Sequence, residues 1–242
     1  MNKDFADINV LILAGGQGSR LRSVSGSTPK GMVLIAGKPF LHLLYTSLIQ
    51  QGFQRIIFCT GYGAEAIEEY FRRLNPAVFF SREQTPLGTA GAIKAAEKII
   101  TSDPFLVLNG DSLCDISFLP LIEFHLKKKA LATIVAAPSQ ERRDGGYLQL
   151  NDSQQILRFD EKQYQGEAAL NAGIYLFQRE ILKRIPAGQK SSLEHDILPG
   201  LKTEERYAFV TSTPVEDIGT PERLDSFRRG FRQSPEGALR AS

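Results

Sequence analysis

Short, unbroken apolar runs alternate with stretches of helical apolar spacing over the first half of the chain. The runs are rich in β-branched residues and stop at glycine or polar residues, as strands buried on both faces do. The predicted strands cover residues 8–14, 55–60, 78–80 and 105–108, and the predicted helices between them cover residues 40–51, 65–74 and 90–100. Strands that alternate with helices are typical of a parallel sheet with helices on both faces.

The second half of the chain carries strand patterns that follow one another closely. The predicted strands here are 131–137, 147–150, 156–159, 172–177 and 207–211, and a closing helix is predicted over 222–231. Ser191 and Glu194 have capping-box spacing, which predicts a further helix over residues 195–201. We therefore predict an α/β fold, a Rossmann-like three-layer sandwich whose mostly parallel central sheet has a mixed or antiparallel extension.

The closely spaced strands extend one sheet and do not indicate a second domain. We expect a single domain over residues 1–232, with halves at 1–115 and 116–232. Residues 233–242 contain Pro235 and Gly237 and few large apolar groups, so we expect a frayed tail there.

Charge and cysteine content narrow the classes of function. The 242 residues include 29 Lys and Arg against 27 Asp and Glu, a balance that argues against a nucleic-acid partner. No apolar stretch approaches the ~18 residues of a membrane span, and the first residues hold no signal-peptide pattern. Cys59 and Cys114 both lie in apolar runs, which favours two buried free thiols in a reducing, cytoplasmic setting.

A glycine-rich loop directly after the first strand is the sharpest chemical signal. It reads LILAGGQGSRL over residues 11–21, and its glycines let backbone N–H groups turn inward to cradle a polyphosphate. A P-loop would end in Gly-Lys-Ser/Thr, whereas this loop ends Gly18-Ser19-Arg20. A dinucleotide fingerprint would need a third glycine where Leu21 stands, and an acidic residue about 20 positions later. Both of these motifs are excluded.

Together with a downstream Pro29-Lys30, the loop resembles the signature of the sugar-1-phosphate nucleotidylyltransferases. Five further motifs like those of the family follow in order and extend the resemblance over residues 9–227: EQTPLGTAG (83–91), LNGD (108–111), FDEK (159–162), NAGIY (171–175) and VEDIGTP (215–221). The sequence departs from the family at Gly31, where another proline is usual, and a glycine there predicts a more flexible loop around Lys30.

Within the family, the chain most resembles the D-glycero-D-manno-heptose 1-phosphate guanylyltransferases. The short length, the lack of a C-terminal repeat domain and the SLEHDILP segment at 192–199 carry this finer resemblance. It implies transfer of a nucleoside monophosphate from GTP, or another NTP, to a sugar 1-phosphate, with release of pyrophosphate, and it is compatible with a homo-oligomer. The alternatives are a hexose 1-phosphate uridylyl- or thymidylyltransferase and a non-catalytic nucleotide-sugar-binding regulatory subunit.

The reaction implied needs no protein nucleophile or base, because the attacking phosphate oxygen is already anionic near neutral pH. It needs positioning and charge neutralisation of two anions that repel each other. By resemblance, Arg20 contacts the leaving pyrophosphate, Lys30 the α-phosphate and Lys162 the sugar phosphate. Asp111 and Asp217 are the implied ligands of Mg²⁺, which prefers carboxylate oxygens and keeps sites for water and phosphate.

The resemblance also implies binding residues for both substrates. The nucleotide would contact Leu13, Ala14, Gly15, Gly16, Gln17, Gly18, Glu83, Gly88 and Thr89. The sugar phosphate would contact Asn109, Gly146, Lys162 and Asn171, and Glu161 would either contact the sugar or support Lys162. Apart from Asn109, this assigns sugar binding to residues 116–232 and nucleotide binding to residues 1–115. Glu83 would meet the base, and a carboxylate can accept from both N1–H and N2–H₂ of guanine, whereas uracil and thymine offer a single such donor. This favours GTP.

Overall fold

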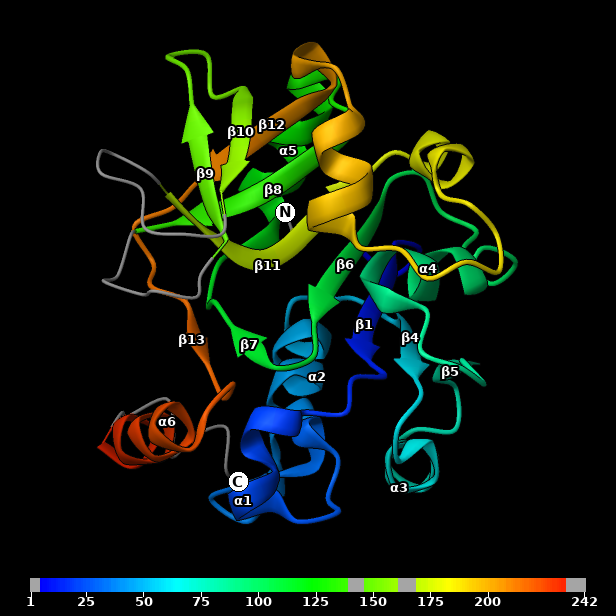
Figure 1. Ribbon diagram of the computed structural model, residues 1–242, viewed down its shortest axis with the longest axis vertical. Helices are drawn as coiled ribbons and strands as arrows, with labels where there is room; N and C mark the ends of the chain where they lie inside the picture. Colours follow the sequence, from blue (N-terminus) through cyan, green and yellow to red (C-terminus); the bar gives the residue numbers. More distant parts are fainter. Residues whose placement is uncertain (1–4, 139–145, 161–168, 234–242) are drawn as a thin grey trace.

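We describe residues 5–138, 146–160 and 169–233 of a computed structural model. Within these residues nine strands form one mixed sheet, whose central path has the order β10-β9-β11-β6-β1-β4-β5 (Figure 1). The parallel part consists of β1 (Asn9–Ala14), β4 (Arg55–Thr60), β5 (Phe79–Arg82) and β6 (Phe105–Asn109). The predicted α/β class and its parallel first half are confirmed.

The second half of the chain extends the same sheet. β11 (Ala169–Phe177) runs antiparallel to β6 and, through its other pairings, carries the sheet onward. The extension contains β8 (Ala132–Ala137), β9 (Tyr147–Leu150), β10 (Ile156–Asp160) and β12 (Arg206–Val210), with β12 parallel to β8. The predicted mixed extension is therefore present. Strands of both predicted halves share one sheet.

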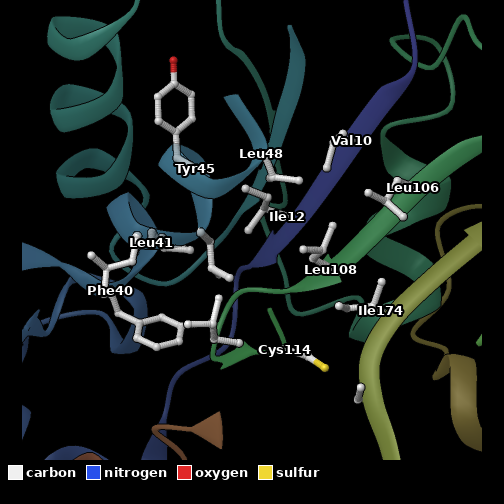
Figure 2. Close-up of a cluster of buried hydrophobic side chains, with 14 of the residues drawn as sticks. Val10, Ile12, Phe40, Leu41, Tyr45, Leu48, Leu106, Leu108, Cys114 and Ile174 are labelled. Carbon is white, nitrogen blue, oxygen red and sulfur yellow. The ribbon is translucent and has the colours of Figure 1, made fainter. Parts of the chain in front are cut away.

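Helical layers cover both faces of the sheet, because successive residues of each strand point to opposite sides. On one face Val10 and Ile12 of β1 join a core cluster, part of which is drawn in Figure 2. That cluster includes side chains from α2 (Phe40–Gln50), α3 (Ala64–Leu74), α5 (Phe118–Lys128) and α6 (Pro221–Gln233). On the other face Leu11 joins a second cluster with α4 (Gly88–Ala95) and the 3₁₀ turn Arg179–Arg184. The three-layer arrangement is thus observed.

The predicted helix over residues 195–201 is wrong as an α-helix. The segment forms a π-helical turn (Leu193–Ile197) followed by a 3₁₀ turn (Leu198–Gly200). Its cap is Ser192, whose Oγ accepts from His195 N at 3.3 Å, whereas the Ser191 carbonyl accepts from Ala90 and Gly91 of α4. Pro199 has no N–H to donate, so a regular α-helix could not continue through it.

The bounds of several other elements differ slightly from the prediction. The predicted helix 90–100 begins two residues early, at Gly88, and its regular part ends at Ala95. The strand predicted at 78–80 lies at Phe79–Arg82. Of the tail predicted at 233–242, Gln233 ends α6, and the remainder lies outside the described residues.

Both cysteines are buried free thiols, as predicted. No helix in the described part of the chain has the length and apolarity to cross a membrane.

Two short antiparallel ribbons lie outside the main sheet. β7 (Ser112–Leu113) pairs antiparallel with β13 (Glu216–Asp217), and β2 (Leu34–Ile35) pairs with β3 (Lys38–Pro39). In Figure 1 β7 and β13 lie beyond the end of β6, on the side toward which β1 and β6 point. The glycine-rich loop leaves β1 at the same end and continues into a 3₁₀ turn (Ser19–Leu21) and α1 (Arg22–Ser25). Open α/β sheets bind ligands at this end.

Candidate active site

The glycine-rich loop is held between Lys30 and Glu83. Gly18 has a left-handed φ of 57°, and a Cβ there would lie 2.9 Å from the Lys30 Cβ. A Cβ at Gly15 would lie 2.7 Å from Glu83 Oε1. Gly16, in contrast, has no neighbour within 4 Å of where a Cβ would be, so its backbone faces open space. The loop therefore packs closely at two glycines and leaves the third facing a cavity.

Arg20 and Lys30 line the cavity of about 260 Å³ in front of this loop, which we call the loop cavity. Lys30 Nζ donates to Asp111 Oδ2 at 2.6 Å, and the lysine side chain is only 13% exposed. Backbone N–H groups of a glycine loop, together with the two cations, make this region suited to phosphate groups.

Gly31 makes a close contact that the sequence did not predict. Gly31 is buried, and a Cβ at this position would lie 2.5 Å from Leu41 Cγ in the first turn of α2. The glycine therefore allows the 3₁₀ turn Lys30–Met32, which carries Lys30, to pack directly on α2. The flexibility predicted for the loop stays a prediction.

Asp111 and Asp217 come from segments far apart in sequence and line one cavity of about 160 Å³, the carboxylate cavity. The β7–β13 ribbon brings them together, because Asp217 pairs with Ser112 and Ile218 N donates to the Asp111 carbonyl at 3.0 Å. Asp217 Oδ1 accepts from Gly219 N at 2.7 Å, and Arg223 lies 3.4 Å away.

The donor set fits Mg²⁺ bound between substrate phosphates. In the described residues no three His, Cys, Asp or Glu side chains come together, so the protein ligands would be the two aspartates alone. Mg²⁺ is commonly held by one or two carboxylates, with waters and phosphate oxygens completing its coordination.

A third cavity of about 540 Å³, the wide cavity, adjoins the loop cavity at Leu13, Gly16 and Asp111. Glu83 and Lys190 line it together with Gln17, Pro86 and Ala92. Glu83 is half-buried, and its Oε2 accepts from Leu87 N at 3.0 Å. Burial, and secondarily the Glu83 charge, raises the pKa of the Cys59 thiol to about 12, so Cys59 is inert beneath the site.

Gly88 and Thr89 join the wide cavity to the segment after β11. Gly88 has φ +72°, and a Cβ there would lie 2.5 Å from the Ser191 carbonyl oxygen. Thr89 Oγ1 accepts from Leu193 N at 2.8 Å and donates to Glu194 Oε2 at 3.2 Å. Both residues line the cavity, and both also dock α4 against residues 191–194.

The structure brings the predicted site residues together at one end of the sheet. The loop cavity is lined by Leu13, Ala14, Gly16, Gly18, Arg20, Lys30 and Asp111, the wide cavity by Gly15, Gln17, Glu83, Gly88, Thr89 and Asn109, and the carboxylate cavity by Asp217, Gly146 and Asn171. Glu161 and Lys162 lie outside the described residues. Lys190 and Arg223 were missed, because single basic residues far from the glycine loop carry no distinguishing local pattern.

Comparison with known proteins agrees with this geometry. The sequence profile described as "Nucleotidyl transferase" matches residues 9–233. The chain belongs to this nucleotidyl transferase family. The D-glycero-alpha-D-manno-heptose 1-phosphate guanylyltransferase of Aneurinibacillus thermoaerophilus is 35% identical over 93% of this chain and 98% of its own length. The predicted family and enzyme class are thereby confirmed.

Two further nucleotidyl transferase relatives extend the comparison. Crystal structures of HddC from Yersinia pseudotuberculosis, one of them complexed with GMP-PN, have a TM-score of 0.83 and 38% identity over 93% of this chain and 99% of theirs. The mannose-1-phosphate guanylyltransferase catalytic subunit beta of Drosophila melanogaster is 36% identical over 87% of this chain but only 59% of its own length. The relatives from A. thermoaerophilus and D. melanogaster are both named guanylyltransferases.

Proposed function

We propose that this nucleotidyl transferase transfers GMP from GTP to D-glycero-D-manno-heptose 1-phosphate, giving a GDP-heptose and pyrophosphate. The observation that carries the proposal is the adjacency of the three cavities, which all share Asp111. The loop cavity is lined by Arg20 and Lys30, the wide cavity contains Glu83, and the carboxylate cavity contains Asn171 and Gly146. Three adjacent cavities with these linings suit the phosphates, the base and the sugar phosphate of one reaction. The relative from A. thermoaerophilus, similar over nearly its whole length, supports the heptose.

In the proposed reaction an oxygen of the sugar phosphate attacks the α-phosphorus of GTP. A P–O bond forms to the sugar phosphate, and the bond from the α-phosphorus to the bridging oxygen of pyrophosphate breaks. Arg20 is suited to the leaving pyrophosphate because its planar guanidinium binds two phosphate oxygens at once. Lys30, held by Asp111 at 2.6 Å, places a positive charge beside the α-phosphate. Positioning and charge neutralisation supply the rate enhancement, with no proton transfer required.

Asp111 and Asp217 are the proposed ligands of Mg²⁺. Bound between the phosphates, the ion would neutralise negative charge that develops during transfer. The β7–β13 ribbon holds the two carboxylates at one cavity, while Lys30 and Arg223 balance their charge.

Glu83 and Lys190 are the proposed readers of the base. The Glu83 carboxylate can accept from N1–H and N2–H₂ of guanine, and it keeps acceptor capacity beside its bond from Leu87 N. The Lys190 ammonium, on the same cavity, is a donor suited to guanine O6. Uracil and thymine present a single N–H beside their carbonyls and so match a carboxylate less well.

A matrix of substrates tests this function. Pyrophosphate release is measured with Mg²⁺, each of GTP, ATP, UTP and dTTP, and each of heptose, mannose and glucose 1-phosphates. We expect the highest kcat/KM with GTP and the heptose 1-phosphate. A preference for UTP or dTTP would contradict the guanylyl assignment, a preference for a hexose phosphate would contradict the sugar, and no release with any pair would favour a binding or regulatory role.

A further inference from the structure

A smaller cavity borders the carboxylate cavity at Gly146 and Asn171. These two residues line both cavities, and Asn171 N donates to the Gly146 carbonyl at 2.8 Å, so they form the common boundary. The other polar side chains of the smaller cavity, which we call the outer cavity, belong to Tyr147, Asp160, Glu194 and His195. None of these four residues was assigned a role from the sequence.

The outer cavity is small, with a volume of about 40 Å³. It has room for a few water-sized groups, since one water molecule needs roughly 10–15 Å³ of cavity volume. A sugar ring does not fit there, but a short side chain of a sugar ring does.

The balance of charge differs between the two cavities. Three cations (Arg20, Lys30 and Arg223) outnumber Asp111 and Asp217 around the carboxylate cavity, whereas the outer cavity contains the carboxyl groups of Asp160 and Glu194 and no Lys or Arg among its described lining residues. This difference favours a sugar phosphate whose phosphate faces the cations and whose far hydroxyls face carboxylate acceptors.

Glu194 lines the outer cavity, and hydrogen bonds hold its side chain in place. Its Oε1 accepts from the buried Tyr175 hydroxyl at 2.7 Å, and its Oε2 accepts from Ser192 Oγ at 2.9 Å and Thr89 Oγ1 at 3.2 Å. Protein donors thus take up most of its acceptor capacity. Asp160, at the end of β10, is 18% exposed, and its Oδ1 lies 2.8 Å from Arg158 Nε. Arg158 itself is 70% exposed.

We infer that the outer cavity binds the exocyclic C6–C7 diol of a heptose 1-phosphate, with Asp160 accepting its hydroxyl groups. The inference rests on the proposed function and specifies how that function selects its sugar. A vicinal diol can donate to both oxygens of one carboxylate, whereas a hexose has a single exocyclic hydroxyl at that end. Asp160 is therefore a specificity-determining residue that favours a seven-carbon over a six-carbon sugar.

The test is the ratio of kcat/KM for the heptose 1-phosphate to kcat/KM for mannose 1-phosphate, both with GTP. Asp160→Asn replaces an anionic acceptor with an amide that faces the hydroxyls with a donor, so this ratio should fall about tenfold. The KM for GTP should stay within twofold of the wild-type value, because Asp160 does not line the wide cavity.

Two control variants separate recognition from strand geometry. Arg158→Met removes the ion pair but keeps the carboxylate, and Asp152→Asn removes an exposed carboxylate from the turn between β9 and β10. Both should keep the wild-type ratio within twofold. An unchanged ratio in Asp160→Asn, or an equal fall in Arg158→Met, would overturn the inference while GDP-heptose formation by the wild type still supports the proposed function. A wild type that does not use the heptose phosphate would overturn both, and the wild-type measurement alone shows this.

Discussion

The base preference depends on one side chain, Glu83. Glu83→Gln puts an amide donor against the donors of guanine and removes the charge, so kcat/KM with GTP should fall about tenfold or more. The loss with UTP and dTTP should be smaller. Lys30→Ala is the control variant, because Lys30 lines the loop cavity. This substitution should lower kcat/KM by about the same factor for every nucleotide. Equal losses with all nucleotides in Glu83→Gln would remove Glu83 from base recognition.

Substitution of Asp111 or Asp217 tests the proposed metal site. Asp111→Asn and Asp217→Asn should each lower kcat at least about 100-fold, because each removes a charged ligand from the proposed metal site. The thermal unfolding midpoint should change little, since both residues lie at an open cavity rather than in the core. Titration of Mg²⁺ in the activity assay measures the effect. Near-normal kcat of either variant at saturating Mg²⁺ would exclude that residue as a ligand.

At the scale of elements, the contact between the Lys30–Met32 turn and α2 controls the position of Lys30. Gly31→Ala should destabilise the protein by roughly 1–3 kcal/mol, because its Cβ would overlap Leu41. It should also lower kcat, since the turn must move to accommodate the methyl group. Chemical denaturation and steady-state kinetics measure the two effects. Adding Leu41→Ala should recover part of the activity, and no recovery would show that Gly31 acts by another route.

Elements were predictable where the signal is local. The runs at 55–60 and 147–150 coincide with β4 and β9, because buried strands leave continuous apolar runs. The π-helical turn at Leu193–Ile197 was not predictable, because its shape follows from the Ser191 carbonyl bonding to α4. That contact is tertiary, and a capping pattern read along the chain cannot include it.

At the scale of the whole molecule, the described site residues that motifs identified line adjoining cavities, whereas two further lining residues carried no sequence signal. Lys190 meets Glu83 at the wide cavity only because α4 docks against residues 191–194. Arg223 meets Asp217 because the β7–β13 ribbon leads directly into α6. The role of Gly31 also needed the fold, because Leu41 approaches it from another element.

The stability of the molecule should depend on pH through His125, a buried residue of α5. Burial lowers its pKa to about 4 from 6.5, although Asp103 partly opposes this, and its ring contacts Thr133 Oγ1 at 2.8 Å and Gln178 Nε2 at 3.2 Å. Between pH 6.5 and 4 the unfolded chain binds a proton that the folded chain does not, so stability falls as pH falls through this window. The loss is on the order of 3 kcal/mol at pH 4.

Chemical denaturation of the wild type and of His125→Gln from pH 7 to pH 4 measures this contribution. The variant should be less stable at pH 7, and the difference between the two proteins should narrow as the pH falls. A difference that is constant across the range would show that His125 does not titrate on unfolding.

The account as a whole is tested most directly by following both products of one reaction. The protein is incubated with Mg²⁺, GTP and D-glycero-D-manno-heptose 1-phosphate, and GDP-heptose and pyrophosphate are quantified over time by mass spectrometry and a coupled assay. We predict that the two products accumulate in equal amounts, and that dTTP in place of GTP lowers the initial rate at least tenfold. Equal or faster product formation with dTTP, or the absence of both products with GTP, would contradict the account.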